Sequence, residues 1–233
     1  MCGRFTLTVH QLGDVVDLLG ASIDPELLAG YHPRYNVAPG ETHWLLRQKE
    51  GRREVIPAGW GLINHWAKDP RVGFKQINAR AETLTTRPAF RDAFRQRRGV
   101  VLADGFYEWR GPKGAREPLR FHRPDDGLML LAGLYEGWRD PETGDFRRTF
   151  TIVTTKPNRL VAPIHDRMPV VIEMEDLDAW LTGEAPETLL HPAPDDALVM
   201  EPASPRLNQA GQDDPDVLDP EDPRARRQLG LFS

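Results

Sequence analysis

Residues 1–5 (MCGRF) carry the only cysteine of a 233-residue chain. A small residue in second position normally permits removal of the initiator Met, which would leave Cys2 with a free α-amine beside its thiol. Such an aminothiol condenses with an aldehyde: the amine forms an imine, and the thiol closes on the imine carbon to give a thiazolidine ring. The amine titrates at roughly 7.7–8.0 and the thiol at about 8.5, so modest tuning makes either group nucleophilic. Cys2 is either such a nucleophile or a chance terminal cysteine, and the other residues must decide.

Proton transfer at such a centre requires further groups, and two residues have suitable chemistry. Glu108 stands among the aromatic residues Phe106, Tyr107 and Trp109. Apolar surroundings remove water from a carboxyl group and raise its pKa toward the range that is useful for acid and base catalysis. His165 is a second acid or base, because an imidazole titrates near neutrality. The structural alternative for His165 is a histidine packed in the core.

Further polar residues interrupt segments that otherwise read as strands and turns. Arg80 and Arg167 have the chemistry to hold phosphates that flank a reacting sugar, and Trp66 could stack on a base. For each residue alone a structural role is the commoner explanation, such as a buried hydrogen bond for Asn78 or a salt bridge with Glu82 for Arg80. Taken together, they favour an N-terminal aminothiol with its own acid, base and phosphate-holding groups.

The elements that must position these residues follow from apolar periodicity and from turn residues. Apolar spacing of three and four predicts helices over 8–19, 88–99 and 174–181. Apolar runs between turn residues predict strands over 42–48, 54–60, 100–102, 104–109, 119–122, 128–134, 149–154 and 198–200. Periodicity alone therefore predicts a mixed α+β fold. We expect residues 1–212 to form a single domain and residues 213–233, rich in Pro, Asp and Arg, to form a flexible tail.

Composition narrows the compartment and the partners. One cysteine allows neither an intrachain disulfide nor a cysteine-based metal cluster, and no apolar run reaches transmembrane length. We therefore expect a soluble, cytoplasmic protein that uses no metal or other cofactor and binds no membrane. The net charge is −5, yet residues 71–123 contain 13 basic and 5 acidic residues, whereas residues 184–233 contain 4 basic and 11 acidic residues. The first segment could present a basic face to phosphates.

Six segments, in order along the chain, resemble the SOS-response-associated peptidase (SRAP) family, whose bacterial and eukaryotic members shield abasic sites in single-stranded DNA. The segments are residues 1–5 (MCGRF), 34–40 (RYNVAPG), 60–63 (WGLI), 78–83 (NARAET), 104–109 (DGFYEW) and 165–169 (HDRMP). The resemblance implies a single mixed α/β domain in which twisted antiparallel sheets form a barrel-like core with helices around it.

The resemblance also implies a covalent reaction. After loss of Met1, Cys2 would form a thiazolidine with C1′ of the ring-opened abasic deoxyribose. Asn78 would position the sugar and the N-terminal amine, Glu108 would serve as general acid and base, and His165 would protonate the sugar oxygen. Thiol-dependent cleavage after Met1 and a weak lyase activity at abasic sites are further activities that the family implies.

The DNA contacts that the resemblance implies are spread along the chain, at Arg4, Pro39, Trp66, Arg80, Arg91 and Arg167. The arginines would hold phosphates, while the tryptophan and the proline loop would line a channel for single-stranded DNA. The expected partner is single-stranded DNA with an abasic site, bound by a monomer at the nucleoid or replication fork. One position departs from the family pattern of paired asparagines: Asn208 is followed by Gln209.

Two other functions stay open at this level. Glutamine amidotransferase domains also begin with Met-Cys-Gly, so an N-terminal-nucleophile hydrolase that releases ammonia from glutamine is an alternative. A non-catalytic binder of single-stranded DNA is the other, and it would tolerate loss of Cys2. The acidic net charge argues against the binder, because binding without covalent capture depends more strongly on attraction to phosphates.

Overall fold

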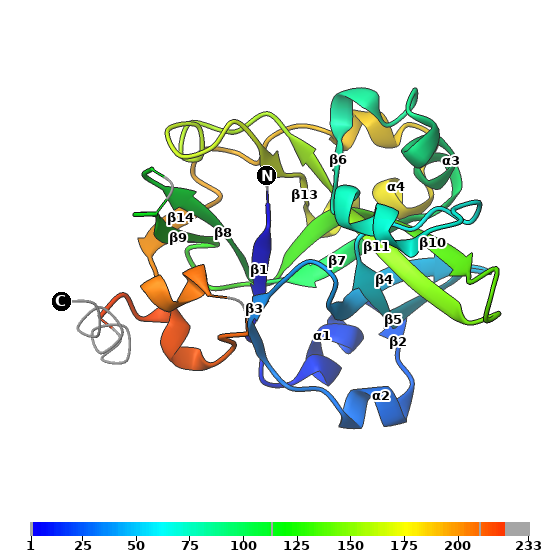
Figure 1. Cartoon of the computed structure of the whole chain (residues 1–233), viewed down its shortest axis with the longest axis horizontal. Helices are drawn as coiled ribbons and strands as arrows, with labels where there is room; N and C mark the ends of the chain where they lie inside the picture. Colours follow the sequence, from blue (N-terminus) through cyan, green and yellow to red (C-terminus); the bar gives the residue numbers. More distant parts are fainter. Residues whose placement is uncertain (1, 113, 210, 222–233) are drawn as a thin grey trace.

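Five strands close into a barrel at the centre of the computed structural model, which describes residues 2–112, 114–209 and 211–221 (Figure 1). In the order of their pairing they are β11 (Phe146–Thr155), β10 (Met129–Arg139), β7 (Arg98–Ala103), β4 (Thr42–Lys49) and β5 (Arg52–Trp60). Neighbours along this order pair antiparallel. β5 returns to β11 through a short parallel pairing, Gly59 with Thr149 and Trp60 with Phe150, which joins the two ends of the sheet.

Side chains on these strands alternate between the inside and the outside of the barrel. Leu45 of β4 and Val101 of β7 belong to the apolar cluster inside it. Their neighbours Leu46 and Val100 pack with the helices on the outer surface. Because successive strand residues point to opposite faces, both faces of each barrel strand are buried, which explains the nearly continuous apolar runs in the sequence.

The helices of the described chain are short and cover the outside of the barrel: α1 (Leu12–Leu18), α2 (Pro25–Ala29), α3 (Pro88–Gln96) and α4 (Leu177–Thr182). As predicted, α3 begins at Pro88 in its first turn. It ends at Gln96 rather than at Gly99, because β7 already begins at Arg98. Gly99 serves the strand instead: a Cβ there would lie 2.7 Å from the carbonyl oxygen of Leu46 in β4.

A second, antiparallel sheet lies beside the barrel, with strand order β14-β9-β8-β1-β3 (Figure 1). Its strands are β14 (Val199–Pro202), β9 (Glu117–His122), β8 (Gly105–Arg110), β1 (Arg4–Leu7) and β3 (Arg34–Val37). Phe5 of β1 and Phe106 of β8 pack into the cluster inside the barrel, so one face of this sheet shares the barrel core. The N-terminal strand is therefore an interior strand of its sheet.

Short elements attach the remaining site segments to the barrel. These are β2 (Ala21–Ser22), β6 (Asn78–Arg80), β12 (Met168–Pro169), β13 (Val171–Ile172) and the 3₁₀ turns η1 (Pro70–Lys75), η2 (Ala81–Thr83), η3 (Met174–Asp176), η4 (Pro186–Leu189), η5 (Pro205–Asn208) and η6 (Pro215–Leu218). β6 pairs parallel with β11, and β12 pairs antiparallel with the end of the same strand. β11 thus brings the segments around residues 78 and 165 to one end of the barrel.

Part of the segment expected to be a tail packs on the second sheet. The Asp213 carboxylate accepts hydrogen bonds from the backbone N–H groups of Tyr35 and Asn36 in β3, and it forms an ion pair with Arg34. Val217 in η6 is fully buried. The expected boundary at residue 212 therefore falls inside a packed segment, and residues 222–233 of the expected tail lie outside the described residues.

The expected mixed α/β domain with a barrel-like core is confirmed. The parallel closure by β5 and β11 is the feature that a purely antiparallel expectation misses. None of the described helices combines the length and apolar composition that a bilayer span requires.

Candidate active site

Cys2 lies immediately before β1 and is fully buried. β1 runs between β3 and β8, so this end of the chain is held on both sides. The Cys2 thiol points to the carbonyl oxygen of Arg4, with Sγ and O 3.8 Å apart. Burial raises the pKa of the Cys2 thiol well above its ordinary value, and the negative charge of Glu108 raises it further. The thiol therefore stays protonated at neutral pH unless a base removes its proton.

Asn78 connects the N-terminal segment to the barrel. Its backbone pairs with Ile152 of β11, which fixes the start of β6. Its side-chain Nδ2 donates a hydrogen bond of 2.8 Å to the carbonyl oxygen of Cys2. Because Asn78 is anchored by a central strand, this bond holds the main chain of the candidate nucleophile in place.

Glu108 lies on β8 and is 4% exposed. Strand alternation places its side chain on the same face as Phe106, toward the barrel, while Tyr107 packs on the opposite face with the C-terminal segment. Desolvation raises the pKa of the Glu108 carboxyl, and the charge of His165 acts in the opposite direction. Glu108 thus lies within electrostatic reach of both Cys2 and His165.

His165 stands in the segment that leads into β12, and 28% of its side chain is exposed. Its Nδ1 accepts a hydrogen bond of 3.0 Å from the backbone N–H of Arg167. In a neutral imidazole that accepts at Nδ1, the proton is carried by Nε2. The Asp166 carboxylate lies 3.1 Å from the same Nδ1 and would accept from it once the ring is protonated.

Arg167 and Arg80 occupy different environments, although the sequence suggested the same role for both. Arg167 is buried, and its two terminal nitrogens donate to the Glu82 carboxylate at 2.7 and 2.9 Å and to the Thr154 carbonyl oxygen at 2.5 Å. The hydrogen bonds from Arg167 hold the pKa of Glu82 below its usual value. Arg80 is exposed. Glu82 therefore bonds Arg167 directly, and the salt bridge considered for Arg80 goes to the other arginine.

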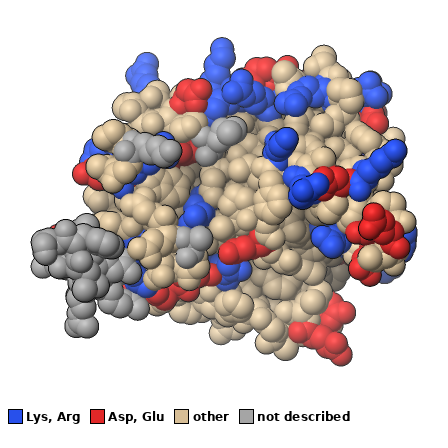
Figure 2. Space-filling view, in the orientation of Figure 1, with Lys and Arg blue, Asp and Glu red and all other residues tan. Residues whose placement is uncertain are grey.

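Trp66 and Arg91, two further expected DNA contacts, are exposed. Trp66 is 49% exposed and meets the edge of His65, with ring centroids 4.7 Å apart. Arg91 lies on α3, where its Nε bonds Asp92 at 3.2 Å. Figure 2 shows Lys and Arg side chains gathered along the upper edge and right side of this face, where Figure 1 places β6 and α3. Both elements belong to the basic segment noted in the sequence.

Arg4 faces a separate cavity of about 410 Å³ next to Gly3. Its Nη1 donates to Asn36 Oδ1 at 2.9 Å, and burial lowers the pKa of its guanidinium. Asn208 lines the same cavity, where its Oδ1 accepts from Trp109 Nε1 at 2.9 Å. Asn208, the asparagine that keeps its place in the C-terminal motif, is therefore tied to β8, the strand that carries Glu108.

The chain matches the family model described as SOS response associated peptidase (SRAP) over residues 1–210. It belongs to this family. It is 39% identical to the abasic site processing protein YoqW of Bacillus subtilis (strain 168), over 94% of this chain and 99% of that protein. Identity to the abasic site processing protein YedK of Escherichia coli (strain K12) is 32%, over 79% and 81% of the two chains. The abasic site processing protein HMCES of Gallus gallus is 28% identical over 94% of this chain and 78% of its own length.

The SRAP match extends to a solved structure. A protein from Bacteroides thetaiotaomicron superposes with a TM-score of 0.84, covering 94% of this chain and 99% of its own. The sequence identity is 24%, so this likeness supports the fold alone.

Within this SRAP chain, Asn78 bonds the main chain of Cys2, and Glu108 lies within electrostatic reach of Cys2 and His165, while the catalytic roles expected for these four residues stay predictions. The sequence did not reveal Glu82 as the partner of Arg167, because the two residues are 85 positions apart and Arg80 is the nearer cation in sequence. In the part of the chain that the structure describes, no group of three or more His, Cys, Asp or Glu side chains could hold a metal ion.

Proposed function

We propose that this chain recognises abasic sites in single-stranded DNA and captures them covalently through Cys2. The observation that carries the proposal is the meeting of Cys2, Asn78, Glu108 and His165 at the start of β1. These residues come from four separate segments, and packing alone does not require that combination of acid, base and thiol. Relatives named abasic site processing proteins support the substrate class.

The proposed reaction needs the α-amine of Cys2, which is an amide nitrogen as long as Met1 remains. After Met1 is removed, the amine attacks the C1′ aldehyde of the ring-opened deoxyribose, and loss of one water gives an imine. The thiol then adds to the imine carbon. The product is a thiazolidine in which C1′ is bonded to both N and Sγ. The sum is aldehyde plus aminothiol giving thiazolidine and water, with no oxidant or reductant.

Glu108 is proposed to move the protons of both steps. In its acid form it protonates the departing hydroxyl as the imine forms. The resulting carboxylate then takes the proton from the Cys2 thiol, which by itself remains protonated in its buried setting. A desolvated carboxyl suits this double role, because the rise in its pKa makes its acid form easier to populate than that of an exposed carboxyl.

His165 and Asn78 are assigned to the sugar and to the main chain. In its imidazolium form His165 would give its Nε2 proton to the sugar ring oxygen as the ring opens, which leaves a neutral imidazole, while the C1′ hydroxyl loses its proton to water. Asn78 holds the carbonyl group of Cys2 through its 2.8 Å hydrogen bond, which would fix the main chain that carries both the amine and the thiol.

Intact-mass spectrometry with and without an abasic-site oligonucleotide tests the proposal. We expect the protein without Met1 to gain the mass of the oligonucleotide less one water, in a product that survives heat. Cys2→Ala should form no heat-stable adduct. Cys2→Ser should form only an imine, which borohydride traps and which otherwise leads to strand cleavage by elimination. A Cys2→Ala variant with a full yield of heat-stable adduct would refute the proposal.

A chain carrying extra residues before Met1 provides the matched control. It retains the thiol, the fold and the DNA-binding surface but has no α-amine on Cys2, so no adduct should form. The same mass spectra report processing: if Cys2→Ala loses Met1 as completely as the wild type, the thiol takes no part in removing it.

The two alternatives make different predictions. An N-terminal-nucleophile hydrolase would release ammonia from glutamine, and we expect none above background. In a gel that contains denaturant, a non-catalytic binder would retain neither the abasic strand nor the intact strand. The proposal instead predicts retention of the abasic strand alone.

A further inference from the structure

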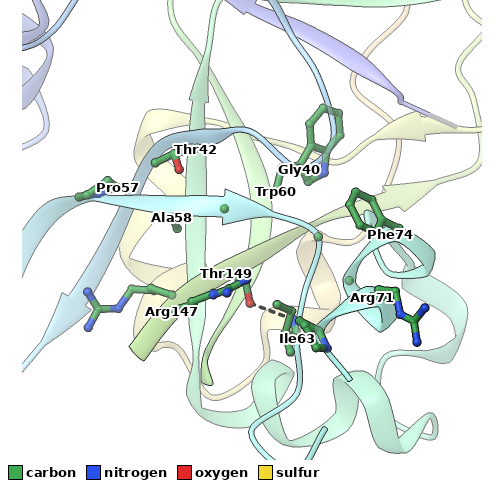
Figure 3. Close-up of a pocket in the computed structure, with 15 residues that line it drawn as sticks. Gly40, Thr42, Pro57, Ala58, Trp60, Ile63, Arg71, Phe74, Arg147 and Thr149 are labelled. Carbon is green, nitrogen blue, oxygen red and sulfur yellow. Dashed lines mark hydrogen bonds between the residues drawn. The ribbon is translucent and has the colours of Figure 1, made fainter. Parts of the chain in front are cut away.

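A cavity of about 470 Å³ opens on the other side of Trp60 from β1. It forms where β5 and β11 diverge, next to their short pairing at Gly59 and Thr149. Figure 3 shows Pro57 and Ala58 of β5, Phe74 of η1 and Thr149 of β11 around it. The proposed covalent reaction makes no use of this cavity.

The charged residues that line this cavity are all arginines: Arg71, Arg147 and Arg148. Arg71 is neutralised locally, because its guanidinium bonds the Asp69 carboxylate at 2.8–3.0 Å. For Arg147 and Arg148, no carboxylate of the described residues lies within the 4 Å of an ion pair. The cavity therefore carries uncompensated positive charge.

Arg148 points away from the cavity, because consecutive strand residues face opposite sides of the sheet. Its guanidinium lies over the ring of Phe146, and its pKa is lowered by burial and by the neighbouring guanidinium of Arg47. Neither of these neighbours lines the cavity, so Arg147 is the one of the two whose side chain can face it.

An exposed aromatic ring forms the rim on the opposite side. Phe74 is 66% exposed, and its ring packs over the turn at Gly40, where a Cβ would lie 3.3 Å from the ring. η1 is held close to the end of β5, because Gly61 (φ +130°) and Gly73 approach so closely that a Cβ on either would meet the other's carbonyl oxygen at 2.8 Å. The ring is therefore presented to solvent on a fixed support.

The cavity is also close to the Cys2 cluster. Trp60 forms its inner wall, donates from Nε1 to the carbonyl oxygen of Ile77 at 2.8 Å, and packs against Phe5 with ring centroids 4.9 Å apart. Ile77 directly precedes Asn78, and Phe5 belongs to the strand that follows Cys2. A strand leaving the Cys2 cluster across the turn at Gly40 would next meet Phe74.

We propose that this cavity is a second nucleotide subsite, which takes one nucleobase against Phe74 and one phosphate at Arg147 from the same single strand that reacts at Cys2. The inference rests on the proposed function and extends it. Aromatic faces next to cations without acidic partners are the combination with which proteins hold single strands irrespective of sequence. The subsite would lengthen the binding footprint beyond the reacting nucleotide.

Equilibrium binding of oligonucleotides of different length tests the subsite. The oligonucleotides carry a stable tetrahydrofuran abasic analogue, which cannot react, and extend by one nucleotide at a time on either side. For the wild type we expect one extension to tighten binding sharply. Phe74→Ala should weaken the binding of the longer strands by about 5- to 150-fold, and Arg147→Gln should lower the salt slope by about 0.7 for the longer strands only. Arg52→Gln, at the far end of β5, is the matched control and should keep the full gain.

Photocrosslinking identifies the position directly. With 5-iodouracil placed in turn at each nucleotide, we expect one position, separated from the abasic analogue, to crosslink to the peptide that contains Phe74. The subsite is refuted if Phe74→Ala and Arg147→Gln both keep the full length-dependent gain, or if no position crosslinks to that peptide. Because neither measurement needs the covalent reaction, failure of the subsite and failure of adduct formation are separate results.

Discussion

Cys2 and Glu108 are 0% and 4% exposed, whereas Trp66, expected on the rim of the same site, is 49% exposed. The buried pair has lost its water, and the pKa of each group is raised as a result. The rim keeps its water and has side chains free to meet a phosphate or a base. The contrast suggests a division of labour: substitutions in the interior should change rates and pH dependence, and substitutions on the rim should change affinity and salt dependence.

Arg167 shows which residues belong to the buried interior and which to the exposed rim. The sequence expectation placed it on the rim as a phosphate clamp, but its guanidinium is buried against Glu82 and Thr154. Its position between His165 and β12 suggests that it supports the acid–base segment. Its direct contact with DNA stays a prediction.

The largest effect is expected from the interior acid and base. Glu108→Gln keeps the size and hydrogen-bonding shape of the side chain but cannot transfer a proton, so adduct formation should slow by about 10²- to 10⁴-fold. Single-turnover kinetics with abasic-site DNA measure this rate. Glu117→Gln, an exposed carboxylate on β9, is the control and should react at the wild-type rate. An equal slowing of both variants would contradict the role of Glu108.

Removing Arg167 should mainly destabilise the fold. Arg167→Ala leaves the Glu82 carboxylate without its bidentate partner, at an expected cost of about 1–3 kcal/mol in the free energy of unfolding, since Glu82 is itself 45% exposed. Arg80→Ala should change it by less than about 0.5 kcal/mol. Urea denaturation compares the two variants. Equal stability of both would place Arg167 on the rim after all.

Trp66 should act through binding alone. Trp66→Ala is expected to weaken binding of single-stranded DNA by about 1–3 kcal/mol, because a base loses its stacking partner. The rate of adduct formation at saturating DNA should not change. Leu18→Ala, which removes a side chain of similar exposure on α1, is the control. A lower saturated rate with unchanged affinity would assign Trp66 to the interior group.

The stability of the interior should depend on pH in a defined direction. The pKa of Glu108 is raised by burial, so the folded chain holds this proton more tightly than the unfolded chain. Ionised Glu108 therefore costs stability at pH values above its folded pKa, and the cost disappears below its unfolded pKa of about 4.3. Glu108→Gln should raise the melting temperature more at pH 8 than at pH 4. Thermal unfolding at both pH values measures the difference, and the opposite order would contradict burial of the charge.

The smallest expected effect belongs to Arg80. Arg80→Gln should reduce the slope of log affinity against log salt by about 0.7, the value for one phosphate contact on a single strand. Fluorescence anisotropy between low and moderate salt measures this slope. Arg95→Gln on α3 is the matched control, and equal changes in the two variants would mean that neither arginine has a specific place on the strand.

The sequence predicted the local features of the fold because these depend on near neighbours. Apolar runs bounded by turn residues marked the strands of the barrel, and Pro88 marked the start of α3. The closure of the barrel through Gly59 and Thr149 could not be predicted in this way, because 90 residues separate the two and neither carries a signal for the other. Asp213 shows the same limit: its acidic, Pro-rich surroundings are typical of a tail, but its carboxylate bonds backbone N–H groups of β3.

The candidate site shows the same limit: the reactive residues could be predicted from the sequence, but the contact between Arg167 and Glu82 could not. Cys2, Asn78, Glu108 and His165 stood out as chemically reactive or polar residues in apolar context, and each has a place near the others. Which carboxylate would bond Arg167 was decided by the three-dimensional path of β11 and β12. The sequence offered only the neighbouring pair Arg80 and Glu82, which the structure does not use.

The central place of β1 in its sheet has a consequence for the order of events during synthesis. Cys2 leaves the ribosome first, but β8, the neighbour that carries Glu108, is made only after about 105 further residues, and Asp213 closes β3 later still. At roughly 5–20 residues per second, the nascent N-terminus waits about 5–20 s before it can be enclosed. Met1 can be trimmed from an extended chain in that interval, before Cys2 is buried.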